Sequence, residues 1–272
     1  MDGKKALIGM SGGVDSSVAA LLMLRAGYEC IGATMRLYDN DMIGLEKGHT
    51  CCSLDDVEDA RSVARRLGIP HYVFNFKDDF ERQVIRKFVS CYECGGTPNP
   101  CIDCNRYLKF DRLLRRALEL GCDCVVSGHY AQIRKSGDRY LLYKAADKAK
   151  DQSYFLCQLS QRQLSRALFP IGHLLKPEVR RIATEQHLAT AARKDSQGIC
   201  FVGKVDLPTF LQQKLARKKG NVHEILPAWP KFRREAAPAD GSEPSDEQLA
   251  AQGAAISTLA CFVVTPVLML LL

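Results

Sequence analysis

Two glycines flanked by hydroxyl groups and a carboxylate lie near the amino terminus and are well suited to phosphate chemistry. The segment Ser11-Gly12-Gly13-Val14-Asp15-Ser16 follows directly on the apolar run 6–10. Glycines let backbone N–H groups approach anionic oxygens closely, and the start of a helix adds a favourable dipole. Asp15 could orient the loop or help to hold a magnesium ion. Because no Gly-Lys-Ser/Thr follows, this is not a Walker loop. A phosphate-binding loop is predicted in preference to a simple glycine-rich turn.

A pair of thiols behind a proline turn forms the second group of interest. Asn99 is a good helix N-cap and Pro100 a good first helical residue. Cys101 is then predicted in the first turn, and Cys104 one turn further along the same face. A thiol near a helix N-terminus ionises more easily than a free thiol, and thiolates are what nucleophilic attack and metal binding require. The alternative is two helix cysteines at chance spacing.

A third thiol, Cys200, follows the flexible position Gly198. It could lie in a loop beside the same site or simply be buried. The twelve cysteines of the chain are not preceded by a signal peptide, so a reducing cytoplasm is the expected location. Four cysteines in or beside apolar runs are predicted to be small core residues: Cys30, Cys122, Cys124 and Cys157.

Strand-like and helix-like runs alternate through the first half of the chain. The predicted strands are 4–10, 29–34, 72–76 and 123–127. The predicted helices are 16–26, 53–67, 79–90 and about 101–120. This alternation predicts an α/β fold with a doubly wound, mostly parallel sheet. Ligands bind such sheets at the carboxyl ends of strands, where Ser11–Ser16 would follow the first strand and Ser127-Gly128-His129 the fourth.

The second half continues with a hairpin, predicted from 130–134 and 139–143, and with helices at 161–168 and 177–187. Residues 227–253 have no periodicity and are typical of a linker. Residues 256–272 are apolar but are fewer than the ~20 that span a bilayer comfortably. A membrane tail anchor is therefore less favoured than a non-native end, and no membrane partner is expected.

Five segments in this order resemble the tRNA-specific 2-thiouridylases (the MnmA family) of the ATP pyrophosphatase, or PP-loop, superfamily. They are Ser11–Ser16, Thr97–Asn105, Ser127–Tyr130, Lys150–Leu156 and Lys194–Phe201. The resemblance implies an adenine nucleotide alpha hydrolase-like fold, and in this chain we expect it to be followed by a short helical extension and an irregular C-terminal tail. It also implies that ATP and Mg²⁺ activate C2 of the wobble uridine of tRNA, after which sulfur from a cysteine desulfurase or relay protein replaces the oxygen.

The resemblance carries roles onto individual positions. It implies nucleotide contacts at Gly9, Met10, Ser11, Gly12, Gly13, Val14, Asp15, Ser16, Met35 and Gly128. It implies tRNA contacts at Asn99, Pro100, Cys101, His129, Lys150, Asp151 and Gln152. Cys104 matches the nucleophilic cysteine and Cys200 the one that carries the persulfide.

Two departures from the family keep alternatives open. Many relatives have Asp where this chain has Cys101, so Cys101, Cys104 and Cys200 could instead hold a [4Fe–4S] cluster. The likeness also fades after about Gly220, where relatives continue into a central domain and a β-barrel. We expect a catalytic domain at 1–200, a remnant of the central domain at 201–226 and a linker with an apolar tail at 227–272, in a truncated or frame-shifted gene product. Another adenylating PP-loop enzyme and an inactive RNA- or ATP-binding remnant are the competing hypotheses.

Charge is distributed unevenly along the chain. Residues 221–272 hold three basic and six acidic residues, so residues 1–220 hold 35 and 25, a net charge of +10. This suits a polyanionic partner such as RNA. The helix that carries the two cysteines has a basic face formed by Lys109, Arg112, Arg115 and Arg116. That face is either a solvated surface or a contact for the tRNA backbone.

Overall fold

The computed structural model describes residues 3–38, 54–195 and 207–215. Five strands form a parallel sheet in the order β3-β2-β1-β4-β7. Their bounds are Lys5–Gly9 (β1), Glu29–Arg36 (β2), His71–Asn75 (β3), Cys124–Ser127 (β4) and Ala167–Leu168 (β7). The sequence order reverses direction at β1, so the predicted doubly wound α/β fold is confirmed.

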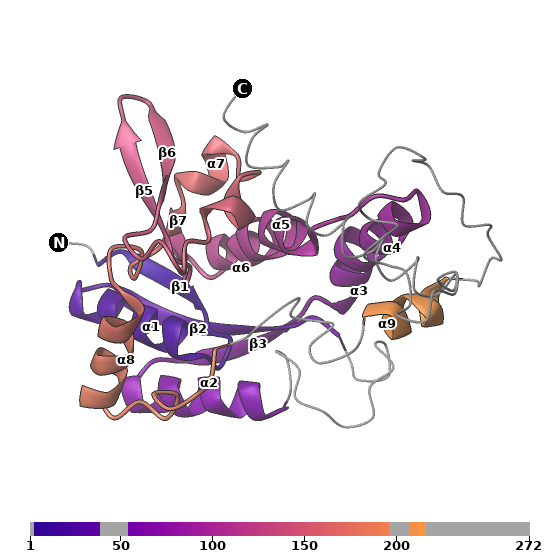
Figure 1. Cartoon of the computed structure of the whole chain (residues 1–272). Coiled ribbons are helices and arrows are strands. Elements are labelled where there is room, and N and C mark those ends of the chain that lie inside the picture. Colours follow the sequence, from indigo (N-terminus) through magenta and orange to yellow (C-terminus); the bar gives the residue numbers. More distant parts are fainter. Residues whose placement is uncertain (1–2, 39–53, 196–206, 216–272) are drawn as a thin grey trace, which may run out of the picture. The chain divides into compact units, whose positions relative to one another are not determined.

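Helices cover both faces of this sheet (Figure 1). One face carries α1 (Val14–Arg25), α2 (Leu54–Leu67) and α8 (Lys176–Glu185). The other carries α3 (Lys77–Phe80), α4 (Arg86–Glu93), α5 (Pro100–Asp103) and α6 (Leu113–Glu119). Successive residues of β1 serve the two cores in turn, since Ala6 and Ile8 pack towards α1 and Leu7 towards α6, all three fully buried.

Both helices predicted on the second face are present, and each is made continuous by π-helical turns; the one predicted over 79–90 is longer than expected, and the one predicted over about 101–120 is shifted by one residue. The segment Glu81–Ile85 joins α3 to α4, and Cys104–Arg112 joins α5 to α6. The first of these composite helices therefore runs from residue 77 to 93, and the second from 100 to 119. π-Helical turns are rare and occur often at functional sites. Here one of them begins at Cys104.

The helix predicted over 161–168 is wrong in its second half. Helix α7 spans only Gln161–Leu164, and the chain then forms β7, in which Ala167 pairs with Val125 of β4. Ser160 and Gln163 form a capping box that starts the helix, but the sheet edge offers main-chain partners to the next residues. A strand of two residues is too short to produce an alternating sequence pattern.

The predicted hairpin is confirmed as β5 (Ala131–Ser136) and β6 (Arg139–Lys144), a separate two-stranded sheet. It is followed by a 3-10 helix, Ser153–Leu156, and further on by α9, Leu207–Lys214. The predicted boundaries at 200 and 226, the linker, the apolar tail and Ser53 all lie outside the described residues. Among the described helices, none has the length and apolarity needed to cross a membrane.

Candidate functional site

The loop between β1 and α1 has a backbone that requires its glycines. Gly12 has φ +74°, and a Cβ placed there would lie 2.5 Å from the carbonyl oxygen of Asp56 on α2. Only glycine tolerates both the left-handed conformation and this close approach. Gly13 is the N-cap of α1 and makes no side-chain cap, so the first N–H groups of the helix remain available to an anion.

The hydroxyl groups of the loop are arranged around the start of α1. The Ser11 amide donates to Ser16 Oγ (3.3 Å), and the two serine Oγ atoms lie 3.4 Å apart. Ser16 and Ser17 both donate to the carbonyl of Gly13, at 3.0 and 2.9 Å. These bonds fix the turn, and they bring the side chains of Ser11 and Ser16 to the same side of it.

The loop after β4 packs directly on this turn. A Cβ on Gly128 would lie 2.6 Å from the backbone of both Asp15 and Ser16, so a side chain at Gly128 would separate the two loops. The loops predicted at the carboxyl ends of β1 and β4 therefore lie in direct contact. Met10 is buried and its amide donates to Ala33 of β2, while Met35 lies near the end of β2 and is partly buried.

The carboxylate of Asp15 has two partners from distant parts of the chain. Lys176 Nζ lies 2.8 Å from both Oδ1 and Oδ2, and the Tyr130 hydroxyl donates to Oδ1 at 2.9 Å. Burial and the neighbouring Asp15 raise the pKa of Tyr130 well above its ordinary value, so this phenol stays protonated. Asp15 is therefore oriented by one fixed cation and one fixed donor.

Asp195 gathers three basic side chains beside Asp15. Its carboxylate contacts Lys150 at 2.8 Å, Lys176 at 2.8 Å and Arg180 at 2.7 Å. Burial opposes ionisation of this carboxyl, but the hydrogen bonds from Lys150 and Lys176 and their charges lower the pKa of Asp195 to about 2. Lys176 bridges the two carboxylates, and the residue as a whole is 8% exposed.

Sequence reasoning missed Lys176, Tyr130 and Asp195 as parts of this site. One sequence signal pointed to Lys176, since a lysine as the first residue of a helix opposes the helix dipole and calls for an explanation. Here the explanation is two carboxylates from elsewhere in the chain. Tyr130 and Asp195 carry no comparable local signal.

The segment 190–195 is fixed beside the start of α1 and beside α2. Thr190 donates to Ser17 Oγ at 2.9 Å, and Arg193 pairs with Asp56 and Asp59 of α2. Asp195 is the last described residue before Cys200, which itself lies outside the described residues.

The predicted tRNA contacts Lys150, Asp151 and Gln152 differ in their surroundings. Lys150 is partly exposed and pairs with Asp195, as stated above. Asp151 accepts from the Ala145 amide (2.8 Å) and from Ser153 Oγ (2.7 Å). Gln152 Oε1 accepts from the backbone N–H of Tyr130 at 3.0 Å, and the backbone N–H of Gln152 donates to the Tyr130 carbonyl at 2.8 Å. Gln152 therefore holds this loop against Tyr130, and Asp151 joins it to Ala145.

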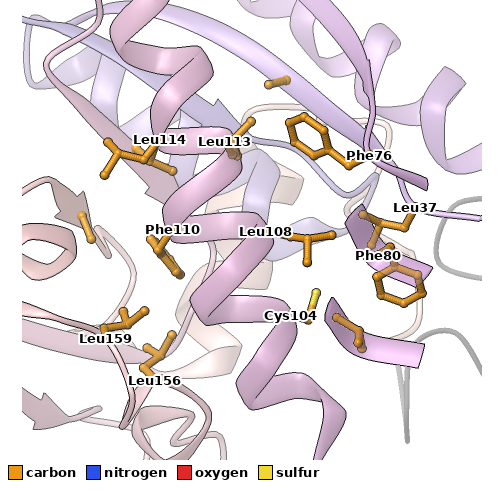
Figure 2. Packing of buried hydrophobic residues seen from close by; sticks show 14 of the residues in the cluster. Leu37, Phe76, Phe80, Cys104, Leu108, Phe110, Leu113, Leu114, Leu156 and Leu159 are labelled. Carbon is orange, nitrogen blue, oxygen red and sulfur yellow. The ribbon is translucent and has the colours of Figure 1, made fainter. Parts of the chain in front are cut away.

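The cysteine-bearing helix begins as predicted. Asn99 is the N-cap of α5, and its Oδ1 accepts from the Cys101 amide at 3.1 Å, with Pro100 as the first helical residue. Cys101 is partly buried, whereas Cys104 is 4% exposed. Figure 2 shows the Cys104 sulfur among the side chains of Leu108, Phe80 and Leu37.

The expected ease of ionisation is wrong for Cys104. Burial raises the pKa of its thiol, with further increases from Cys101 and Asp103 and only partial compensation by Lys109. A helix N-terminus alone would lower the pKa of a thiol. In the structure, desolvation in the hydrophobic cluster outweighs the effect of the helix start.

Two contacts connect this helix to the rest of the site. Asn105 Nδ2 donates to the carbonyl of Phe155, just after the Lys150–Gln152 loop. His129 packs against Phe110 of the helix and Phe169, with ring centroids 6.0 and 5.8 Å apart respectively. Burial lowers the pKa of His129 well below its ordinary value, and Ser127 Oγ lies 2.7 Å from its Nδ1. His129, predicted to contact tRNA, is thus a neutral, buried side chain.

Three of the four cysteines predicted to be small core residues are buried. Cys30, Cys122 and Cys124 are buried, but Cys157 is exposed because it follows the 3-10 helix at the surface. Within the described segments, no group of three or more His, Cys, Asp or Glu side chains could hold a metal ion. On the basic helix face, Arg112 pairs with Asp79, Arg115 with Asp111 and Arg116 with Glu119, which favours a solvated surface.

Comparison with known proteins gives sequence matches over most of the chain. A family model for the tRNA methyl transferase HUP domain matches residues 4–204. The tRNA-specific 2-thiouridylase MnmA of Christiangramia forsetii is 50% identical over 226 residues, which cover 82% of this chain and 57% of that protein. The corresponding protein of Clostridium botulinum strain Alaska E43 is 51% identical over 203 residues, covering 75% of this chain and 56% of that protein.

The chain spans little more than half the length of these curated relatives. Among solved structures, the U34-tRNA thiolase NcsA of Methanococcus maripaludis with its [4Fe-4S] cluster has a TM-score of 0.47 and 19% identity, over 74% of this chain and 63% of that one. A likeness of this degree assigns no ligand. The family model covers most of the chain, and the chain belongs to the tRNA methyl transferase HUP domain family, the MnmA branch of the PP-loop proteins.

Proposed function

We propose that this protein is an ATP-dependent tRNA sulfurtransferase that converts the wobble uridine to 2-thiouridine. The observation that carries the proposal is the joining of the glycine loop to the segment leading towards Cys200, through Asp15, Lys176 and Asp195. A sulfurtransferase of this type must activate a base and deliver sulfur at one place. The 50% identity to proteins named tRNA-specific 2-thiouridylase supports the same reaction.

In the first step, ATP is the activating substrate. The O2 oxygen of uridine attacks the α-phosphorus, a P–O bond forms, pyrophosphate leaves, and the N3 proton is lost. The open N–H groups at the start of α1 and the hydroxyls of Ser11 and Ser16 are the groups we assign to the phosphates. Lys176, held by Asp15, adds a fixed positive charge beside them.

In the second step, sulfur replaces the activated oxygen. The terminal sulfur of a Cys200 persulfide attacks C2, and AMP leaves with the former O2 oxygen. The Cys104 thiol then loses its proton, which restores the N3 proton of the base, and its sulfur attacks the sulfur of Cys200, which gives a Cys104–Cys200 disulfide and leaves sulfur on C2. A thiol reductant must reduce this disulfide before the next turnover. Cys104 is buried, so we propose that it is protected from reaction until the adduct has formed.

The family implies Mg²⁺, which is usually held by one or two carboxylates together with substrate phosphates. Asp15 provides a carboxylate in the segment Ser11–Ser16, and oxygen is the donor type that this ion prefers. The residues therefore fit a magnesium ion that is bound chiefly by ATP. When bound, Mg²⁺ would neutralise phosphate charge.

A [4Fe–4S] cluster on Cys101, Cys104 and Cys200 is the alternative sulfur carrier. The described cysteines fit it less well, because Cys104 is packed among aliphatic and aromatic side chains. We therefore assign no step to a cluster. Absorbance and iron content of protein prepared without oxygen would separate the routes, since an active sample without iron excludes the cluster.

The further proposed partners follow from this reaction. They are tRNA, and a cysteine desulfurase or sulfur-relay protein that loads Cys200, all in the cytoplasm. The competing function is a different adenylating PP-loop enzyme, which would share Ser11–Ser16 but has no use for the three cysteines together. The third candidate is an inactive remnant that binds RNA or ATP without turnover.

The test is the 2-thiouridine content of tRNA from a strain that lacks its own 2-thiouridylase and expresses this chain. We expect 2-thiouridine with the natural sequence and none with Cys104→Ser or Cys200→Ser, while Cys157→Ser, an exposed cysteine, serves as the matched control. Thiolation that persists in either catalytic variant excludes the role given to that cysteine. If the natural chain forms none, ATP–pyrophosphate exchange distinguishes an adenylating enzyme from a remnant.

A further inference from the structure

The β5–β6 hairpin carries a concentration of positive charge that the proposed chemistry does not use. Four basic residues lie on its two strands: Arg134, Lys135, Arg139 and Lys144. Within the part of the chain that the structure describes, none of the four lies within ion-pair distance of a carboxylate. On the cysteine-bearing helix, by contrast, Arg112, Arg115 and Arg116 all have acidic partners.

The two faces of the hairpin have different surroundings. Ile133, Leu142 and Tyr140 share one face and pack against the hydrophobic core, and the Tyr140 amide donates to Gln161 Oε1 at 2.8 Å. The register places Arg134 opposite Leu141 on the other face, which also holds the pairs Gln132–Tyr143 and Ser136–Arg139. Leu141 is 36% exposed and Tyr143 is 40% exposed, so this second face is the solvent face.

The solvent face is ordered by contacts that leave its charge free. The Arg134 guanidinium lies over the Tyr143 ring, with Cζ 4.8 Å from the centroid, and Nη2 donates to Gln132 Oε1 at 3.3 Å. Gln132 Nε2 in turn donates to the carbonyl of Lys144 at 3.1 Å. An arginine stacked on a tyrosine, with no carboxylate to neutralise it, is a typical arrangement for contacts to phosphate and base.

The base of the hairpin is joined to the nucleotide loop. Tyr130, one residue before β5, donates to Asp15 and exchanges hydrogen bonds with Gln152. A ligand on the hairpin is therefore held at a fixed position relative to the loop assigned to ATP. The register places Arg134 and Arg139 on the solvent face, whereas Lys135 and Lys144 share the face of Ile133 and Leu142. A protein partner would need acidic groups to match the two arginines, whereas an RNA backbone presents a continuous row of negative charge.

We propose that the solvent face of β5–β6 (Gln132, Arg134, Arg139, Leu141 and Tyr143) binds the tRNA substrate. Arg134 and Arg139 contact backbone phosphates, and Tyr143 provides a stacking surface for an unpaired base. The inference rests on the proposed function, and adds a surface distinct from Lys150–Gln152.

The experiment measures binding of the full chain to an unmodified tRNA transcript with a wobble uridine, as a function of salt. The double variant Arg134→Gln/Arg139→Gln is compared with Arg115→Gln/Arg116→Gln, which removes the same charge from α6. We expect the hairpin variant to bind about tenfold or more weakly at fixed salt, and its log–log salt slope to fall in magnitude by about 1.4 to 1.8. The control should stay close to the natural chain. Tyr143→Leu should weaken binding about fivefold or more and leave the salt slope unchanged.

Each outcome decides between the two proposals. If the hairpin variant binds tRNA as tightly as the control, the proposal that the hairpin binds tRNA is overturned. In that case, tRNA-dependent pyrophosphate release by the same preparation would still support the proposed function. Weaker binding by the hairpin variant, without any tRNA-dependent pyrophosphate release, supports the surface and counts against the function. A natural chain that binds no tRNA overturns the surface. Thermal melting checks folding, and Arg139→Gln alone replaces the double variant if that one melts early.

Discussion

Lys176 and Asp15 lie 161 residues apart in sequence, yet the Lys176 ammonium is 2.8 Å from both oxygens of the Asp15 carboxylate. Lysines are almost never buried without a partner, and the side chain of Lys176 is only 10% exposed. The pair fixes the first turn of α1, which directly follows the loop assigned to ATP. A buried positive charge is thereby held at the place where phosphate charge would arrive.

Lys176→Met tests this pair, because it leaves Asp15 and Asp195 without their shared cation. Breaking a buried ion pair from one side costs about 3–5 kcal/mol, so we expect a loss of that order in the free energy of unfolding. We also expect tRNA-dependent pyrophosphate release to fall at least about 100-fold. Urea unfolding and a pyrophosphate assay measure the two effects.

Lys148→Met is the control, since Lys148 is exposed and follows Asp147, whose carboxylate accepts from the backbone amide of Lys176. It should change neither quantity appreciably. If Lys176→Met behaved like this control, the assignment of Lys176 to the nucleotide site would be wrong.

Gly12→Ala tests the loop backbone. Alanine at φ +74° is strained, and its Cβ would meet the Asp56 carbonyl, so we expect about 3 kcal/mol or more of lost stability together with loss of ATP binding. Gly27→Ala is a matched control, since Gly27 has φ +82° but no atom within 4 Å of the new Cβ. It should cost only about 1–2 kcal/mol of strain and leave ATP binding intact. Similar unfolding free energies and ATP affinities for the two variants would contradict the account.

Acid should weaken the fold partly through Asp195. Its pKa is lowered from 3.8 to about 2, so the ionised carboxylate stabilises the folded state above the unfolded-state pKa of about 4. That contribution, about 2 kcal/mol, should be lost as the pH falls from about 4 towards 2. Asp195→Asn should be less stable at pH 6, and its unfolding free energy should change less between pH 5 and 2.5. Parallel pH profiles for the variant and the natural chain would disprove this.

Alkylation tests the protection of Cys104. Burial raises its pKa, so little thiolate is present at pH 7, and the rate should rise only at higher pH than for an ordinary thiol. With iodoacetamide and mass spectrometry we expect the exposed Cys94 and Cys157 to react at least about tenfold faster in the native protein. Urea should abolish the difference. Equally fast labelling of Cys104 in the native state would show that it is not held in the hydrophobic cluster.

The sequence predicted those parts of the fold and site that depend on local chemistry. Gly12, Gly13 and the Asn99–Pro100 cap lie where their backbone preferences place them, and the strand–helix alternation gave the parallel sheet. The sheet-edge strand Ala167–Leu168 could not be predicted, because two residues have no pattern of their own.

Long-range contacts account for the features that sequence reasoning missed. Lys176 and Asp195 lie beside Asp15 only in the folded chain, because they are 161 and 180 residues away from it in sequence. The same holds for Cys104: its position at the helix start favoured ionisation, but its burial depends on Leu37 and Phe80, which come from other elements.

The fate of the uridine oxygen tests the central claim most directly. A tRNA transcript carrying ¹⁸O at O2 of the wobble uridine would be incubated with the full chain, ATP, Mg²⁺ and a persulfide donor, and nucleosides and AMP analysed by mass spectrometry. Attack of O2 on the α-phosphorus predicts one ¹⁸O atom in AMP for each 2-thiouridine formed. Formation of 2-thiouridine with unlabelled AMP, or ATP cleavage that never yields 2-thiouridine, would contradict the account.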